Sequence, residues 1–268
     1  MRIFNGKKEA KKILGELARK IRKEKIQPRL AVVAVAPDSS SRLYIKNKKK
    51  AAKKAGIKVV KYDFSAKSKE KEVIRKIEKL NDNPSVHGII VQLPLPKKFN
   101  SSKIISKISP QKDVDGFQEG SIFQPVLPSA ILIALKKADA GIKKKRVLAV
   151  VNSKIFGRTL EFFLEKKGIK MNYILRRDLA KSKTRRADVL ITVCGCPGLI
   201  RGGMIKDGAI LIDAGIVLKS GKIKGDVDRK DVAGKASFLT PVPGGIGPLT
   251  VALLLKNVYL AYGNSKNH

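Results

Sequence analysis

The hydrophobic positions in the first hundred residues switch repeatedly between a helical and a strand period. Residues 6–24 carry apolar side chains at helical spacing, and Asn5 is placed to cap that helix. A continuous apolar run at 29–36 then predicts a buried strand. The elements expected next are a Ser-capped helix that Gly56 ends, strands at 57–63 and 86–92, and helices at 68–81 and 101–108. This alternation is typical of βαβ units on a mainly parallel sheet.

The alternation stops at residues 110–128, a segment with Pro and Gly that indicates a domain junction, and a second alternation follows. We expect a helix starting at Ala130–Ala138, strands at 146–152, 169–175, 187–193 and 208–213, a helix at 157–167, an extended piece at 237–241, and a closing helix over 247–264. The pattern therefore predicts an α/β protein with two domains, the last helix packing back on the first.

The charge balance is the most unusual feature of the composition. Lys and Arg number 58 against 22 Asp and Glu, which gives a net charge of +36. Lysines occur in every region and Arg contributes only 14 of the 58, while aromatic residues are 5% and Trp is absent. This scatter favours a general surface bias over a nucleic-acid interface, which needs clustered Arg and stacking aromatics.

Several other classes are excluded. The apolar stretches considered run short of the ~20 residues that cross a bilayer, so we expect a cytoplasmic protein with no membrane partner. Cys194 and Cys196, separated by one Gly, are poorly placed for a disulfide and too few for a structural metal site.

Chemistry is concentrated in four short segments. In the first, Tyr44 and Lys48 share a helix face, where a phenol beside an amine can hold a flat heterocycle near a proton-transfer group; a solvated lysine-rich face is the alternative. In the second, Gln92 lies directly beyond a buried strand, where parallel sheets bind ligands, although a capping amide would also suit that place. His87, at the strand start, is interpreted as structural.

The third segment holds Asp113 and Asp115 in a Gly turn, as metal ligands, turn formers or acceptors for an amino-heterocycle. The fourth, residues 240–250, has two prolines and three glycines before a helix and can direct backbone N–H groups at a ligand. Between them, a strand, a turn with only Gly157, and a helix have the layout of a dinucleotide-binding turn. No further carboxylate or His cluster supports a metal.

Together these segments resemble the FolD family, bifunctional methylenetetrahydrofolate dehydrogenases and methenyltetrahydrofolate cyclohydrolases. The matching pieces are the Tyr44/Lys48 helix, VQLPLP, KDVDG, ADVLITVCGCPGLI, GAILIDAGI, GDVD and TPVPGGIGPLT, in order along nearly the whole chain. The resemblance implies a folate-binding catalytic αβα domain (1–122 with 249–268), a Rossmann-like NAD(P)-binding domain (123–248), and a folate cleft between them.

The resemblance also implies roles for single residues. Lys48 would be the catalytic lysine, Tyr44 would stack on the folate, Gln92 would tune Lys48, and Asp115 would accept from the pterin amino group. The other residues it places at the sites are Pro243, Gly244 and Gly245 for folate, and Val151, Asn152, Ser153, Gly157, Arg176 and Ile216 for the dinucleotide. It further implies NADP, with NAD as the alternative, a homodimer, and a place in the one-carbon supply to purine biosynthesis.

The departures from the family pattern fall mostly on the cofactor side. Val151-Asn152-Ser153 stands where the family has a Gly-Arg-Ser turn, and Val126-Leu127 replaces a polar Cys-Thr pair. Arg176 or Arg177 could supply the missing phosphate contact. Two alternatives follow: a cyclohydrolase with weakened or lost dinucleotide binding, and a basic nucleic-acid-binding protein built on this fold.

Overall fold

The computed structural model describes residues 1–118 and 120–265, which form two compact units. The three-stranded unit contains Ala10–Val126 and the chain from Val251 onward, and the six-stranded unit contains Met1–Glu9 and Leu127–Thr250. The two-domain α/β architecture is therefore confirmed. The first nine residues differ from the expected ranges, because β1 (Arg2–Ile3) pairs with β11 (Phe238–Leu239) in the larger sheet.

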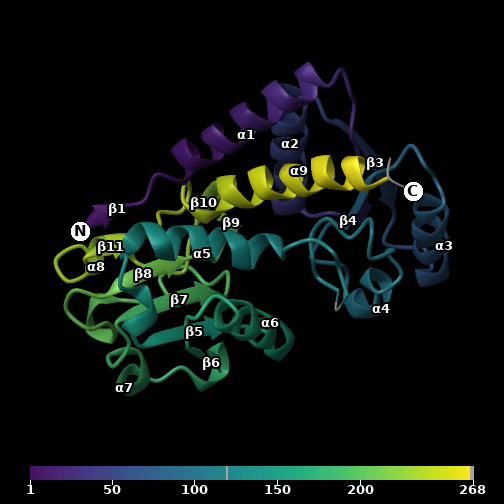
Figure 1. The fold of residues 1–268 in the computed structure, drawn as a ribbon. Coiled ribbons are helices and arrows are strands. Elements are labelled where there is room, and N and C mark those ends of the chain that lie inside the picture. The colour runs from purple at the N-terminus through teal and green to yellow at the C-terminus, as the bar shows by residue number, and fades with distance from the viewer. Residues whose placement is uncertain (119, 266–268) are drawn as a thin grey trace. The chain divides into compact units, whose positions relative to one another are not determined.

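The three-stranded unit is a parallel sheet covered by helices on both faces (Figure 1). Its strand order is β3 (Lys58–Phe64), β2 (Arg29–Val35), β4 (Gly88–Val91). Its helices are α1 (Gly6–Lys23), α2 (Ser39–Ala55), α3 (Glu70–Asn81), α4 (Ser101–Ile105) and α9 (Ile246–Asn264), the boundary between the units falling inside α1 and α9. Alternate residues of β2 enter different cores: Val32 packs with side chains of α1, α2 and α9, and Val33 with side chains of α3 and α4.

The six-stranded unit has an all-parallel sheet in the order β1-β11-β8-β7-β5-β6. Its remaining strands are β5 (Val147–Val151), β6 (Met171–Leu175), β7 (Val189–Val193) and β8 (Ile210–Asp213), with a hairpin of β9 (Val217–Lys219) and β10 (Lys222–Lys224). Its helices are α5 (Val126–Ala138), α6 (Lys154–Glu165), α7 (Lys181–Thr184) and α8 (Arg229–Val232), with short 3₁₀ turns at Ile142–Lys144, Arg176–Asp178 and Gly202–Met204. This arrangement is the expected Rossmann-like sheet, while the hairpin was not predicted.

The helix ends show where local sequence sets the structure. Asn5 accepts a hydrogen bond from the Lys8 N–H at 2.9 Å, as the capping expectation required. The cap of α2 was predicted as Ser and is instead Asp38, whose carboxylate accepts from Ser41 N at 2.7 Å. Gly56 ends α2 with φ of 83°, a left-handed conformation that glycine adopts without steric cost.

Helix α9 is long and apolar enough, by length and composition, to cross a membrane. Half of that segment is nevertheless buried within the fold. Leu255 and Val258 are fully buried and pack in one core with Leu30 of β2 and Ile45 of α2. This packing is that of a core helix in a folded domain.

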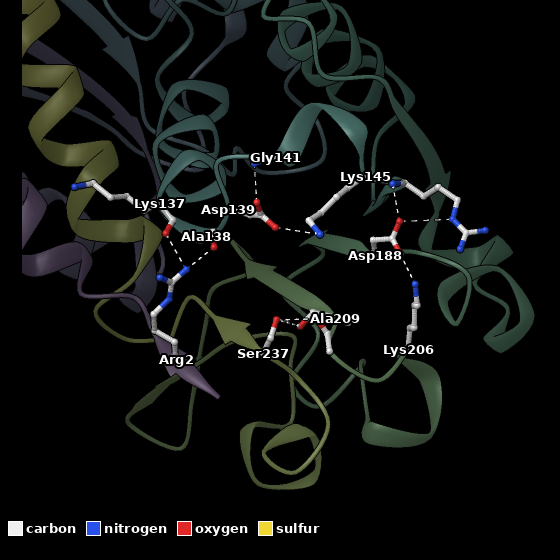
Figure 2. A network of polar contacts seen from close by, with 12 residues as sticks. Arg2, Lys137, Ala138, Asp139, Gly141, Lys145, Asp188, Lys206, Ala209 and Ser237 are labelled. Atoms are coloured by element: carbon white, nitrogen blue, oxygen red, sulfur yellow. Dashed lines mark hydrogen bonds and ion pairs between the residues drawn. The ribbon is translucent and has the colours of Figure 1, made fainter.

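The amino edge of the larger sheet carries exposed ion pairs (Figure 2). Asp188, just before β7, accepts from Lys206 Nζ at 2.5 Å and from the Arg146 N–H at 2.9 Å. These bonds lower the pKa of Asp188 to about 2. Arg2 reaches the carbonyl oxygens of Lys137 and Ala138 at the end of α5, which fixes the short strand β1 to that helix (Figure 2).

Candidate active site

Helix α2 presents Tyr44 and Lys48 one turn apart on the same face. The Tyr44 hydroxyl oxygen is buried and has no hydrogen-bond partner among the described residues. Burial raises the pKa of Tyr44 to about 12, so the phenol stays protonated. A buried polar atom without a partner costs free energy, and a ligand that bonded this hydroxyl would recover that cost.

Lys48 is held by the strand next to its helix. Its Nζ donates to Gln92 Oε1 at 2.9 Å, and the Gln92 amide nitrogen donates to the Leu93 carbonyl at 2.7 Å. Gln92 directly follows β4, at the carboxyl end of the sheet, as the sequence indicated. The second bond fixes which end of the Gln92 amide faces the lysine, so an acceptor and not a donor meets the ammonium group.

The Asp113–Gly116 turn brings a carboxylate near the same lysine. Asp113 is 1% exposed, forms a bridge with Ile89 beside β4, and accepts from Gln118 N at 2.9 Å. Asp113 is therefore the turn former. Asp115 interacts electrostatically with Lys48, and burial with the Asp113 charge raises the pKa of Asp115 to about 6 while Lys48 opposes that rise.

The pKa of Lys48 is determined by two opposing effects. Burial lowers the pKa of Lys48, and the charge of Asp115 raises it again in part. A lysine with a lowered pKa can release its proton more readily than a solvated one and so exchange protons with a substrate. The tyrosine, lysine, glutamine and aspartate singled out in the sequence are thus brought together in the three-stranded unit.

His87 has a structural place. Its Nδ1 accepts from the Arg29 N–H at 3.0 Å, and its ring lies 4.7 Å from the ring of Tyr262. These contacts join the start of β4 to β2 and α9, away from the carboxyl end where Gln92 lies.

The carboxyl edge of the larger sheet holds the residues expected to bind the dinucleotide. Val151 ends β5, and Ser153 caps α6 by accepting from the Phe156 N–H at 3.4 Å. Gly157 lies against the ring of Tyr173, where a Cβ would come within 2.5 Å of ring carbon Cδ2. Helix α6 therefore approaches β6 closely and begins directly after β5, the arrangement in which a helix N-terminus receives a phosphate.

The other expected cofactor residues lie along the same edge. Asn152 donates from Nδ2 to the Cys194 carbonyl at 2.6 Å, which links the end of β5 to the end of β7. Arg176 directly follows β6 and is exposed, and its charge acts on Cys194. Ile216, beyond β8, is half-buried. The N-terminus of α6 and the exposed guanidinium of Arg176 lie at the same edge of the sheet, and both can bind a phosphorylated ligand.

The Gly-rich loop before α9 belongs to the six-stranded unit. Gly245 N donates to the Pro241 carbonyl at 2.7 Å, and the Lys7 N–H donates to the Gly244 carbonyl at 3.2 Å. A Cβ on Gly6 would lie 1.8 Å from the Gly245 oxygen, so the start of α1 packs directly on this loop. Pro243, Gly244 and Gly245 are thus assigned to a different unit from Lys48.

Sequence reasoning missed two buried acids, Asp213 and Asp226. They are 2% and 0% exposed, and both accept backbone hydrogen bonds beside the loop after β7. The signal was partial: Asp213 lies in an otherwise uncharged segment, two residues before Gly215, and Asp226 directly follows Gly225. In the part of the chain that the structure describes, no three His, Cys, Asp or Glu side chains form a group able to hold a metal.

Comparisons with known proteins agree with this geometry. Residues 4–115 match the family model for the catalytic domain of tetrahydrofolate dehydrogenase/cyclohydrolase, and residues 125–266 match that for its NAD(P)-binding domain. The bifunctional protein FolD of Nautilia profundicola is 40% identical over 279 residues, with 98% of each chain covered.

Two solved structures are similar over nearly the whole chain. The FolD methylenetetrahydrofolate dehydrogenase/cyclohydrolase of Campylobacter jejuni has a TM-score of 0.88 at 35% identity, covering 98% of this chain and 99% of that one. The Trypanosoma brucei FolD structure, complexed with NADP and an inhibitor, has a TM-score of 0.89 at 28% identity, covering 99% and 98%.

Proposed function

The chain belongs to the tetrahydrofolate dehydrogenase/cyclohydrolase family, and from this premise we propose that Lys48 is the residue at which its folate substrate exchanges a proton. The protein is a bifunctional enzyme: it oxidises 5,10-methylenetetrahydrofolate to the methenyl form and hydrolyses that product to 10-formyltetrahydrofolate. The 2.9 Å bond from Lys48 Nζ to Gln92 Oε1 carries the proposal, because it holds a lysine of lowered pKa at the carboxyl end of a parallel sheet.

Each neighbour of Lys48 then has a proposed task. Water attacks the methenyl carbon, Lys48 takes up and returns the proton, and the ring opens. Gln92 keeps Nζ oriented, Asp115 accepts from the amino group of the pterin, and the Tyr44 ring lies against the folate with its hydroxyl available to it.

For the oxidation we propose NADP as the cofactor, with NAD as the second candidate. When bound, the cofactor would supply a hydride acceptor for the methylene carbon. The chain's own contribution is to bind and orient: Ser153 and the N-terminus of α6 receive phosphate, Gly157 allows the close approach, and Arg176 supplies a positive charge to the ribose phosphate of NADP. The other residues proposed to bind the dinucleotide along this edge of the sheet are Val151, Asn152 and Ile216.

The net charge of +36 has a proposed use in substrate capture. Folate carboxylates and dinucleotide phosphates are anions, and a positive field speeds their association and makes KM depend on salt. We assign no specific nucleic-acid partner; DNA or RNA affinity that persists at physiological salt, with activity intact after Lys48→Ala, would contradict that assignment. A cytoplasmic location and a supply of formyl groups to purine synthesis complete the proposal.

We also propose a homodimer formed through the six-stranded unit. Ile155 and Phe162 on α6 are 69% and 59% exposed, which is unusual for large apolar side chains on a covering helix. Two chains of this charge repel each other at low salt. Sedimentation across ionic strength tests this assembly, and a monomer at every salt concentration refutes it.

One paired assay separates the proposed function from its nearest rival. Purified protein receives methylenetetrahydrofolate with NADP or NAD in one cuvette and methenyltetrahydrofolate in the other. We expect absorbance changes in both. Hydrolysis with no oxidation under either cofactor would support the rival, a cyclohydrolase that has lost dinucleotide binding. The reason to consider this rival is Asn152, which replaces the arginine of the family pattern.

A further inference from the structure

Two buried carboxylates tie together three segments of the six-stranded unit. Asp226 accepts from the backbone N–H groups of Cys194 at 2.7 Å and Cys196 at 2.6 Å, one on each oxygen. Asp213 accepts from the N–H groups of Gly215 at 3.1 Å, Asp226 at 3.1 Å and Val227 at 2.9 Å. The loops after β7 and β8 are therefore joined to the 225–227 segment through side chains that water does not reach.

The glycines around the two acids show how closely the segments are packed. A Cβ on Gly215 would lie 2.0 Å from Asp226 Oδ2, and a Cβ on Gly225 would lie 2.1 Å from Asp213 Oδ2. Each acid thus occupies the space beside the other's glycine neighbour. A side chain at either glycine would displace a carboxylate and break its backbone bonds.

This network reaches the turn after β5 through one further bond. The Cys194 residue that donates its N–H to Asp226 also accepts, at its carbonyl, the 2.6 Å bond from Asn152 Nδ2. Strands β5, β7 and β8 are neighbours in the sheet, so their carboxyl ends meet at one edge. The hydrogen bonds run without interruption from the β5 turn, through the β7 loop, to the two acids.

We propose that Asp226 and Asp213 are positioning residues for the dehydrogenase reaction, which fix the Cys194–Cys196 loop and, through Asn152, the β5 turn in the form that binds the dinucleotide. The inference rests on the proposed function, since it assigns a purpose to the edge where the cofactor is expected. It also gives Asn152 a function: this side chain joins two loops at a place where the sequence departs from its family.

The raised pKa values of Asp213 and Asp226 agree with a structural role, in which the two side chains bind backbone N–H groups and take no part in the reaction. Burial raises the pKa of both carboxyl groups, and the charge of Asp226 raises that of Asp213 further, to about 7. The groups that face the pair are Thr192, Cys194 and Cys196, and burial raises the pKa of the Cys194 thiol to about 12. Among the described residues, these acids accept hydrogen bonds mainly from backbone N–H groups and from no cation, so both side chains are engaged in holding the loops.

The test compares Asp226→Asn with Asp188→Asn, a matched change at the opposite edge of the same sheet. An asparagine at 226 can accept from only one of the two N–H groups and presents a donor to the other. NADP and NAD are titrated into each full-length protein by calorimetry, and both activities are assayed with the melting temperature. For Asp226→Asn we expect the dinucleotide Kd and KM to rise about tenfold or more, with hydrolysis of methenyltetrahydrofolate within about twofold of the wild type.

The outcomes separate the two claims. Unchanged dinucleotide Kd in Asp226→Asn, or an equal loss of both activities, overturns the positioning role. If Asp226→Asn does not fold, Asn152→Ala decides: it removes the bond to Cys194 from a half-buried side chain and must weaken dinucleotide binding about threefold or more, or the inference is wrong. A wild-type protein that binds neither dinucleotide would instead overturn the dehydrogenase half of the proposed function, and this inference with it.

Discussion

Asp115 in the three-stranded unit and Asp213 in the six-stranded unit are both acids whose pKa lies well above the usual range, at about 6 and about 7. Their surroundings differ. Each has an acidic neighbour, but Asp115 also interacts with a cation, Lys48, whereas Asp213 accepts three backbone N–H bonds. A buried carboxylate near a lysine sets that lysine's protonation and serves chemistry; one surrounded by N–H groups holds loops in place.

The largest effect is expected from Lys48→Met, which removes the cation of the first site. Hydrolysis of methenyltetrahydrofolate needs a proton acceptor, so its kcat should fall about 10²- to 10⁴-fold. Oxidation of the methylene form transfers a hydride and no proton, and it should fall less. Steady-state assays of both reactions measure the split; an unchanged hydrolysis rate would remove Lys48 from the mechanism.

The next effect concerns the second site and is read in stability. Gly215→Ala puts a Cβ 2.0 Å from Asp226 Oδ2, and we expect a loss of about 3 kcal/mol, or roughly 10 °C in Tm. Gly203→Ala is the matched control, because a Cβ there has no atom within 4 Å. Thermal denaturation followed by circular dichroism compares them, and equal melting temperatures would mean that the acids yield to the new methyl group.

A smaller effect is expected at the first site from Gln92→Leu. The variant leaves Lys48 Nζ without its 2.9 Å acceptor, and we expect the hydrolysis kcat to fall about tenfold while Tm stays close to that of the wild type. Gln124→Leu, at an exposed position of the same unit, is the control. If both variants hydrolyse equally well, Gln92 does not orient the lysine.

The smallest effect is a pH dependence of stability from the second site. The raised pKa of Asp213 means that the folded protein holds this proton up to about pH 7, whereas the unfolded chain releases it near the ordinary aspartate pKa of 3.8. The folded state therefore binds more protons between these values, and stability should fall as pH rises from about 4 to 7. Asp213→Asn should flatten this slope in thermal scans, and an identical slope would show that the acid titrates normally.

The helices and strands that show a periodic spacing of hydrophobic residues could be predicted from the sequence. Those that depend on contacts with distant parts of the chain could not. The parallel strands and their covering helices were identified because runs such as 29–36 have few other conformations that bury them. Strand β1 was not, since Arg2 and Ile3 form a strand only by pairing with Phe238 and Leu239. The cap of α2 was misassigned because Asp38 and the serines after it can all serve as caps, and only geometry decides between them.

The same distinction applies to the functional residues: those close in sequence could be placed together, and those far apart could not. Tyr44 and Lys48 are four residues apart, so helix geometry alone placed them on one face. Asp213 and Asp226 are thirteen residues apart with a hairpin between them, and no local pattern indicates that the Asp213 carboxylate accepts the Asp226 N–H. The Asn152 bond to Cys194 spans 42 residues and is equally hidden from local sequence.

The central claim is that the charge of Asp115 sets the proton affinity of Lys48 during hydrolysis. The pH dependence of kcat for methenyltetrahydrofolate hydrolysis, measured on the wild type and on Asp115→Asn, tests it most directly. Asp115 raises the pKa of Lys48, so removing its charge should move the Lys48-dependent limb of the profile to lower pH. A profile that stays in place, or moves to higher pH, would contradict the account.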